Sequence, residues 1–252
     1  MTVAQPIIRL DQVTKAFGAS SAGASFKAVD RLDLEVGSGQ MLALLGKTGC
    51  GKSTIFNMIA GLTEPTSGIV TVDGRNPFHD FDAFRGKIAI VFQNDRLLPW
   101  RTAVQNVELG LEMLDIPPGQ RNETAMHWLG KLGLLGHEHD YPHALSGGMR
   151  QRVSIARAFA TDANILLCDE PFSALDEMTG RTLRAEFLKL VKENGKTAVF
   201  ITHSINEALE IGDRIIVLRR PANIAIDLRL ETETTVAEKD EIRQKIQNVL
   251  AM

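Results

Sequence analysis

A glycine-rich run with one lysine and two hydroxyl side chains is the segment with the most evident chemistry. It joins an apolar stretch, residues 41–45, to a second one, residues 55–59, and this pattern predicts a strand, a loop and a helix. In that context the run is typical of a phosphate-binding loop, because its glycines let several N–H groups face phosphate oxygens. Lys52 would supply a cation for the β- and γ-phosphates, and the Ser53 hydroxyl would coordinate Mg²⁺. The alternative is a chance glycine-rich turn. The run reads Gly46, Lys47, Thr48, Gly49, Cys50, Gly51, Lys52, Ser53, Thr54.

A second candidate site is a pair of adjacent carboxylates, Asp169 and Glu170, which follows the apolar run at residues 165–168. Neighbouring residues of a strand point to opposite sides, so the two acids are expected to do different work. Asp169 would reach the Mg²⁺ shell, and Glu170 would act on the attacking water as general base. An acidic, solvated strand end is the competing interpretation.

A third candidate is the run Leu145, Ser146, Gly147, Gly148, Met149, Arg150, Gln151, Arg152. It opens a predicted apolar helix at about residues 149–159. A hydroxyl and unblocked N–H groups at the start of a helix offer a second anion site. The competing interpretation is an ordinary serine N-cap.

The two cysteines, Cys50 and Cys168, are too few for a disulfide framework and are typical of a reducing compartment. Cys50 lies inside the glycine-rich loop, where Lys52 and a helix start would favour its thiolate. We therefore expect Cys50 to react with a maleimide, and we expect Cys168, on a buried strand, to react far more slowly.

Apolar runs and breakers predict the elements that hold these residues. Strands are expected at residues 7–13, 32–36, 41–45, 88–92, 165–168, 198–202 and 215–218, with a mobile hairpin loop at 18–25. Residues 97–159 have helical spacing, and the tail from 236 to 252 places Ile242, Ile246, Val249 and Leu250 on one helical face. Strands that alternate with helices predict an α/β fold with a parallel core.

Bulk composition narrows the function classes. The chain has 252 residues with 44% hydrophobic and 23% charged residues, enough apolar content for a sizeable core. The net charge of −3 does not favour nucleic-acid binding. No apolar run approaches the length of a membrane span, and the first residues do not fit a secretory signal, so a membrane role would require docking on another protein.

The run at residues 145–152 resembles the signature of the ABC family of ATPases, and the family's other elements occur in its order. Gln93 resembles the Q-loop glutamine, Asp176 ends a D-loop-like Ser-Ala-Leu-Asp sequence, and His203 resembles the switch histidine. Phe17 stands where the family has an aromatic that stacks on adenine, with core packing as its alternative. The resemblance covers about residues 7–218.

This resemblance implies an ABC-type P-loop nucleotide-binding domain at residues 5–220, with an N-terminal antiparallel β region. A helical subdomain at about residues 97–160 would be inserted in it, followed by a short C-terminal extension at residues 221–252. The implied cofactors are ATP and Mg²⁺, the metal held by Ser53, Gln93 and Asp169. Glu170, His203 and Gln93 would be catalytic. Phe17 and the loop from Gly46 to Thr54 would bind ATP of the same copy, and Ser146, Gly147, Gly148 and Asp176 the ATP of a second copy.

The family arrangement further implies an ATP-dependent homodimer, or a pair with a related ATPase subunit, at the cytoplasmic face of the inner membrane. Its partners would be permease subunits and, indirectly, a substrate-binding protein. The sequence Leu97-Leu98-Pro99-Trp100 is similar to the nitrate, sulfonate and taurine importer ATPases, whereas Lys47, Thr48 and Cys168 depart from that subgroup's usual residues. Trp100 would face the permease or, alternatively, anchor the helical subdomain.

An exporter or lipid-transport ATPase is the other functional interpretation. A chromosome-maintenance protein would need a long insertion between Thr54 and Ser146, and the two residues are too close for one, so this class is discarded. A translation-factor-like protein would need a second glycine-rich loop, and the sequence has one.

Overall fold

The computed structural model describes residues 6–18, 26–230 and 235–251. These form two compact units, of which the first holds the chain up to Phe84 and again from Thr197 onward. The second unit is Arg85–Lys196.

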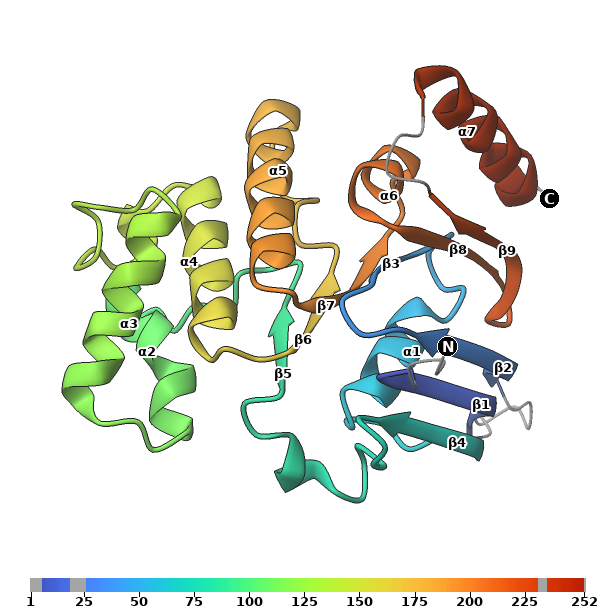
Figure 1. The fold of residues 1–252 in the computed structure, drawn as a ribbon, viewed down its shortest axis with the longest axis horizontal. Coiled ribbons are helices and arrows are strands. Elements are labelled where there is room, and N and C mark those ends of the chain that lie inside the picture. Colours follow the sequence, from blue (N-terminus) through green and yellow to red (C-terminus); the bar gives the residue numbers. More distant parts are fainter. Residues whose placement is uncertain (1–5, 19–25, 231–234, 252) are drawn as a thin grey trace. The chain divides into compact units, whose positions relative to one another are not determined.

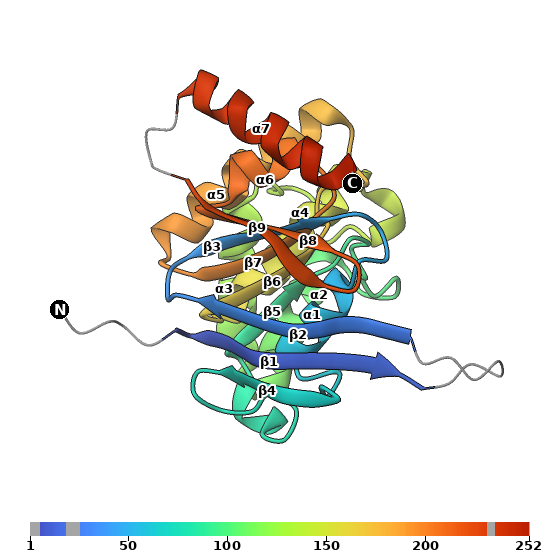
Figure 2. The same ribbon diagram turned by 90° about the vertical axis from the view of Figure 1, so that its right-hand side faces the viewer.

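An antiparallel sheet opens the first unit, with β1 (Ile8–Phe17) between β2 (Phe26–Val36) and β4 (Ser67–Val72). Figure 2 shows these three strands side by side. Ile8 lies opposite Val36 on one side and Val72 on the other, and all three side chains are fully buried. This sheet is the predicted N-terminal antiparallel region.

A second sheet of the same unit holds β7 (Thr197–Thr202), β3 (Met41–Gly46), β8 (Arg214–Arg219) and β9 (Asn223–Arg229), in that order. The first three are parallel and β9 is antiparallel to β8. Every residue of β3 and β7 is buried, as expected of parallel strands covered on both faces. Helices α1 (Lys52–Ile59) and α6 (Ile205–Ile211) follow β3 and β7 directly.

The C-terminal helix α7 (Val236–Ala251) belongs to this unit and packs on α6 and β9 (Figure 1). Ile246 is fully buried there, with Ile242, Val249 and Leu250 packed around it. The helical face predicted from the tail is thereby confirmed, and α7 shares a hydrophobic core with the strands that carry the glycine-rich loop.

The second unit combines a parallel pair of strands with a set of helices. β5 (Ile88–Val91) pairs with β6 (Ile165–Asp169). The helices are α2 (Ala103–Met113), α3 (Pro118–Lys131), α4 (Gly147–Ala160) and α5 (Glu177–Glu193). Trp128 and Phe187 contact Phe159 from two sides, with ring centroids 5.0 Å and 5.6 Å apart.

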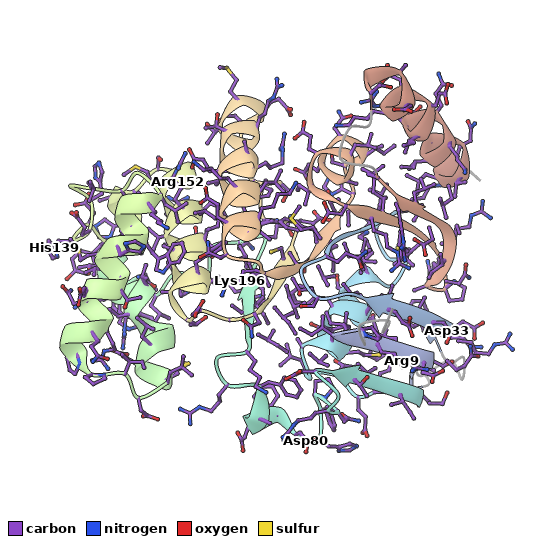
Figure 3. All side chains as sticks on the ribbon, in the orientation of Figure 1. Arg9, Asp33, Asp80, His139, Arg152 and Lys196 are labelled. Carbon is purple, nitrogen blue, oxygen red and sulfur yellow. The ribbon has the colours of Figure 1, made fainter. Side chains whose placement is uncertain are left out.

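Two cations, the partly buried Arg152 and the buried Lys196, also tie segments of the second unit together (Figure 3). Arg152 on α4 pairs with Glu186 on α5 and donates to the Leu132 carbonyl. Lys196, only 6% exposed, donates to the Asp162 carbonyl over 3.0 Å and pairs with its carboxylate.

The α/β fold and all seven expected strands are confirmed, but two strands escaped prediction. β4 has an exposed first half, and β9 carries a polar or charged residue at several positions, so neither shows a clean apolar period. Two short 3₁₀ helices, Phe81–Phe84 and Pro142–Ala144, were also not expected. Within the described residues, no helix is both long and apolar enough to cross a membrane.

Candidate nucleotide site

The glycine-rich loop begins where β3 ends at Gly46, and α1 begins at Lys52. Gly51 just before the helix has φ 109°, a conformation that side chains rarely adopt. A Cβ there would lie 2.5 Å from the Ala28 carbonyl oxygen and 2.7 Å from Ala222 Cβ. Only glycine therefore fits, and the close packing fixes the loop against β2 and the β8–β9 turn.

The Lys52 side chain folds back over this loop and is 6% exposed. Its Nζ donates to the carbonyl oxygens of Gly46 over 2.6 Å and Lys47 over 3.2 Å. The Cys50 N–H donates to the same Lys47 carbonyl over 3.2 Å. The loop is thus a closed turn around one ammonium group, at the start of a helix whose dipole also favours anions.

The expectation that Cys50 is accessible is wrong. Its side chain is 2% exposed and lies close to Gly46 and to the end of β8. The thiol therefore faces the interior of the unit and not solvent. Cys168 is fully buried as expected, and burial raises the pKa of its thiol far above the ordinary range.

His203 lies at the same sheet edge as the loop. β7 is parallel to β3, with Thr202 opposite Leu45, so His203 and Gly46 are the next residues of neighbouring strands. The His203 side chain is exposed. Ser204 caps α6 by accepting from the Glu207 N–H over 3.3 Å, which fixes the turn in which His203 lies.

Phe17 at the end of β1 is 43% exposed, so the core-packing alternative is wrong. It pairs across the strands with Phe26, which is also exposed. The Lys15 ammonium lies 5.2 Å from the Phe17 ring centroid, and the Arg220 guanidinium lies 5.0 Å from that of Phe26. This end of the β1–β2 pair therefore presents two exposed aromatic rings, each with a cation over it. Most of the predicted loop at 18–25 lies outside the described residues.

In the second unit, Gln93, Asp169 and Glu170 gather at one end of the β5–β6 pair. Val91 lies opposite Cys168, so the next residues along both strands are adjacent. The strand ends at Asp169, and Glu170 has φ 46°, a left-handed conformation that is uncommon outside glycine. Glu170 thus leaves the strand conformation, so the predicted alternation of a continuing strand does not apply to this pair of acids. The Ser173 hydroxyl and N–H both donate to the Glu170 carbonyl and hold the turn.

Ser146 is the N-cap of α4, and its hydroxyl accepts from the Met149 N–H over 3.3 Å. The interpretation of Ser146 as an ordinary N-cap is therefore correct for the local structure. It is compatible with anion binding, because the N–H groups of Gly147 and Gly148 lie in the first turn, where a helix offers them no acceptor. Asp176 caps α5 in the same way, and hydrogen bonds from Thr179 lower the pKa of its carboxyl.

Arginines of α4 make contacts with the segment after Gln93 that sequence reasoning missed. Arg150 pairs with Asp95 over 3.0 Å, and Arg157 donates to the carbonyls of Asp95 and Arg96. Burial lowers the pKa of Arg157. Arg150 belongs to the quoted signature run, but nothing in the sequence marks Asp95 as its partner.

Trp100 is 70% exposed, so it does not anchor the second unit's core. The loop that carries it is held by Asn106, which is fully buried. Its amide accepts from the Leu98 N–H over 2.7 Å and donates to the carbonyls of Leu98, Arg101 and Thr102. A large aromatic is thus presented to solvent on a firmly held loop.

Comparisons with known proteins agree with this geometry. The model of the ABC transporter family matches residues 29–173. An uncharacterized ABC transporter ATP-binding protein of Methanocaldococcus jannaschii is 43% identical, covering 96% of this chain and 91% of its own. The taurine import ATP-binding protein TauB of Yersinia pestis is 42% identical, covering 86% and 84%. The dimeric structure of an ATP-binding cassette in a post-hydrolysis state with ADP and Pi has a TM-score of 0.78 at 33% identity, covering 89% and 99%.

The chain belongs to the ABC transporter family and is an ABC-type ATPase. It binds ATP, and its fold is that of the ABC cassettes.

Proposed function

We propose that this chain is the motor of a membrane importer of the nitrate/sulfonate/taurine type, working as a pair of copies that close over ATP. The observation that carries the importer assignment is the exposed Trp100 on its Asn106-held loop, within the Leu-Leu-Pro-Trp sequence that resembles this subgroup. The similarity to a taurine import protein supports it. The chain would reach the cytoplasmic face of the membrane by docking this surface on permease subunits.

The loop from Gly46 to Thr54 would cradle the phosphates, with Lys52 exchanging its carbonyl partners for phosphate oxygens. Phe17, exposed on β1, would stack on the adenine. Ser53, Gln93 and Asp169 offer a hydroxyl, an amide and a carboxylate, and these hard oxygen donors fit Mg²⁺. The metal would neutralise charge on the phosphates when bound.

Glu170 would accept a proton from the attacking water, and its left-handed backbone would aim the carboxylate away from the strand. His203 would hold the γ-phosphate in line. Little covalent chemistry falls to the side chains, so positioning and charge neutralisation supply most of the rate.

Ser146, Gly147, Gly148 and Asp176 would serve the ATP of the opposite copy. Each lies at or beside a helix start, where N–H groups and the dipole favour an anion. ATP would then hold two copies together through one self-complementary interface.

Deletion of the gene, followed by growth on taurine, alkanesulfonates or nitrate as sole sulfur or nitrogen source, tests the importer assignment. Loss of growth on one of these, restored by the wild-type gene and not by a Glu170→Gln variant, is the expected result. Normal growth on all of them, with capture of an exporter or lipid-transport permease by the tagged chain, would favour the alternative.

A further inference from the structure

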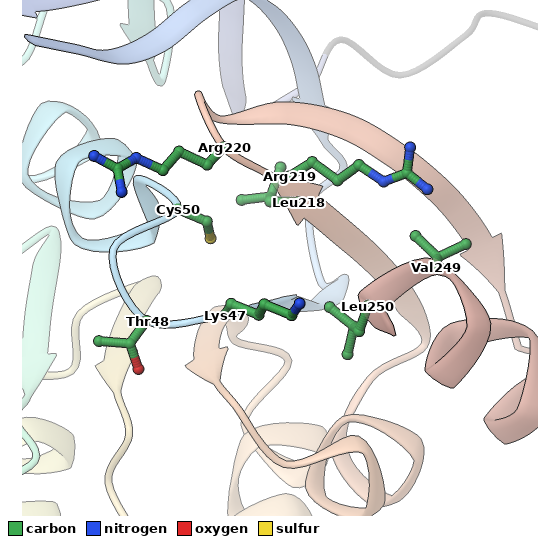
Figure 4. A pocket seen from close by; sticks show the side chains of 8 residues that line it. All are labelled: Lys47, Thr48, Cys50, Leu218, Arg219, Arg220, Val249 and Leu250. Carbon is green, nitrogen blue, oxygen red and sulfur yellow. The ribbon is translucent and has the colours of Figure 1, made fainter. Parts of the chain in front are cut away.

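Arg220 follows β8 directly, and none of the roles above uses its side chain. Figure 4 shows Arg219 and Arg220 extending in opposite directions from the end of β8, so Arg220 points away from the side of the pocket that Val249 and Leu250 line. The Arg220 guanidinium instead lies 5.0 Å from the centroid of the Phe26 ring. Both side chains are exposed. The guanidinium is therefore seated on an aromatic face at the start of β2, where a ligand can reach it.

The backbone next to Arg220 packs on the glycine-rich loop. The Ala222 N–H donates to the Ala28 carbonyl over 2.8 Å, and the Asp30 N–H donates to the Ala222 carbonyl over 3.2 Å. The Ala28 carbonyl and the Ala222 side chain are also the groups that leave no room for a Cβ at Gly51. The Arg220 side chain therefore begins beside the loop and ends at the aromatic ring on β2.

That ring lies next to Phe17, because Phe26 is opposite Phe17 in the antiparallel β1–β2 pair. Side chains directly opposite each other share one face of a sheet, with Cβ atoms about 4.5–5.5 Å apart. Under the proposed function, the adenine lies on Phe17 and the phosphates lie in the glycine-rich loop. The Arg220 side chain joins these two places, and the part of ATP between them is the ribose with the α-phosphate. A guanidinium offers only donors and no acceptor, so the phosphate oxygens are its best partners there.

We propose that Arg220 is a nucleotide-contacting residue that donates to the α-phosphate of ATP, and that Phe26 is a positioning residue that holds its guanidinium. The aromatic face orients the planar guanidinium, so less side-chain freedom is lost when the phosphate binds. The α-phosphate is not the group transferred, so the contact is equally strong before and during hydrolysis and sets affinity and not the rate of the chemical step. The inference rests on the proposed placement of ATP and not on the importer assignment.

Isothermal titration calorimetry of the full chain with MgADP and with a non-hydrolysable MgATP analogue tests the contact. Arg220→Gln should weaken both nucleotides about tenfold and by the same factor, because a charge-assisted hydrogen bond is lost at a phosphate that both share. Arg220→Lys keeps the charge and should restore part of the loss. Arg31→Gln, at an exposed arginine of β2, is the matched control and should bind normally.

Two outcomes of this titration would move the guanidinium to another part of the nucleotide. A loss confined to the triphosphate would place it at the γ-phosphate, and a loss for ATP and ADP that MgGDP does not share would place it at the base. Either outcome, or unchanged binding of both adenine nucleotides by Arg220→Gln, would overturn the proposal. In hydrolysis assays the same variant should raise KM and leave kcat close to that of the wild type. A fall in kcat at unchanged KM would contradict the α-phosphate contact.

A double-mutant cycle tests the positioning role of Phe26. Phe26→Leu should weaken MgADP about two- to fivefold, the size of an exposed cation–π contact, and Phe26→Trp should bind like the wild type. Phe26→Leu combined with Arg220→Gln should bind no more weakly than Arg220→Gln alone, because the ring acts through the arginine. Losses that add in the double variant would mean that Phe26 acts independently of Arg220 and would overturn this role.

Phe17→Ala separates the failure of this inference from the failure of the proposed base site. A loss of affinity in Phe17→Ala without any effect of Arg220→Gln would reject the arginine contact alone. Normal affinity in Phe17→Ala, together with the tenfold loss in Arg220→Gln, would remove the adenine from Phe17 and retain the phosphate contact.

Discussion

Glu170 is the residue whose role depends most on backbone geometry. Its left-handed φ takes the chain out of the strand conformation directly after Asp169, where β6 ends. Strained backbone of this kind is costly and persists where the surroundings hold it, and here Ser173 donates twice to the Glu170 carbonyl.

Glu170→Gln keeps the shape of the side chain and removes the proton acceptor. We expect ATP hydrolysis to fall about 10²- to 10⁴-fold while ATP binding persists. The variant should then accumulate as an ATP-bound pair of copies, measured by size-exclusion chromatography with MgATP. Glu123→Gln, an exposed position of α3, should hydrolyse and elute like the wild type. Wild-type hydrolysis by the Glu170 variant would remove this residue from the role.

Cys50 calls for a different labelling experiment from the one its sequence position suggests. Because its thiol is 2% exposed, a maleimide should react with it far more slowly than with the urea-unfolded chain, with or without MgATP. Cys168, which is fully buried, should be slower still. Peptide mass spectrometry over a time course measures both. Rapid Cys50 labelling that ATP suppresses would show that the loop opens in solution.

The two tryptophans of the second unit have opposite environments: Trp100 is exposed on a loop, and Trp128 of α3 is buried. Trp100→Ala should leave the melting temperature nearly unchanged and weaken co-purification with the cognate permease, since interface aromatics contribute about 2 kcal/mol or more when truncated. Trp128 is 9% exposed and packs on Phe159, so Trp128→Ala should lower stability by about 3–5 kcal/mol. A stability loss from Trp100→Ala with normal assembly would contradict the docking role.

The β8–β9 hairpin contains a bidentate ion pair, Arg214 with Asp227, whose contribution to the stability of the fold depends on pH. Arg214 Nε and Nη2 donate to the two carboxylate oxygens of Asp227, over 2.7 Å and 2.6 Å, and this hydrogen bonding lowers the pKa of the Asp227 carboxyl. The stabilisation is therefore fully present above the ordinary carboxyl pKa of about 3.9 and is lost as the pH falls through the lowered value.

Asp227→Asn should cost about 1 kcal/mol at pH 7, because the carboxylate is partly exposed and screened. The difference between the unfolding free energies of the variant and the wild type should shrink as the pH drops toward 3. Urea unfolding across the pH range measures both. Glu241→Gln on the exposed face of α7 serves as the control. A difference that grows on acidification would show that the pair does not act in this way.

Sequence patterns predicted the elements well where they are apolar or bounded by glycine. The run from Gly46 to Thr54, for example, joins β3 to α1 as its glycines and flanking apolar residues require. The sequence could not show which way a side chain turns inside a tight loop, so the burial of Cys50 was missed. The left-handed turn at Glu170 and the ion pair between Arg150 and Asp95 depend on tertiary contacts and have no local signal.

For the molecule as a whole, α7 makes the C-terminal segment part of the nucleotide-binding unit. Ile246→Ala should cost about 2–5 kcal/mol, because it leaves a cavity among side chains of α6, β8 and β9. Gln247→Ala on the exposed side should be nearly neutral. Urea unfolding measures both. An equally small effect of Ile246→Ala would mean that α7 detaches readily and contributes little to the core.

The two hydrogen bonds between the Lys52 ammonium and its own loop bear on the energetics of nucleotide binding. A buried charge without partners is costly, yet here two main-chain carbonyls satisfy this one from within six residues along the chain. The charge of Lys52 is therefore satisfied within the loop itself. A phosphate oxygen would have to replace these two carbonyl acceptors, so the gain on nucleotide binding is the difference between two sets of hydrogen bonds and not the rescue of an unpaired charge.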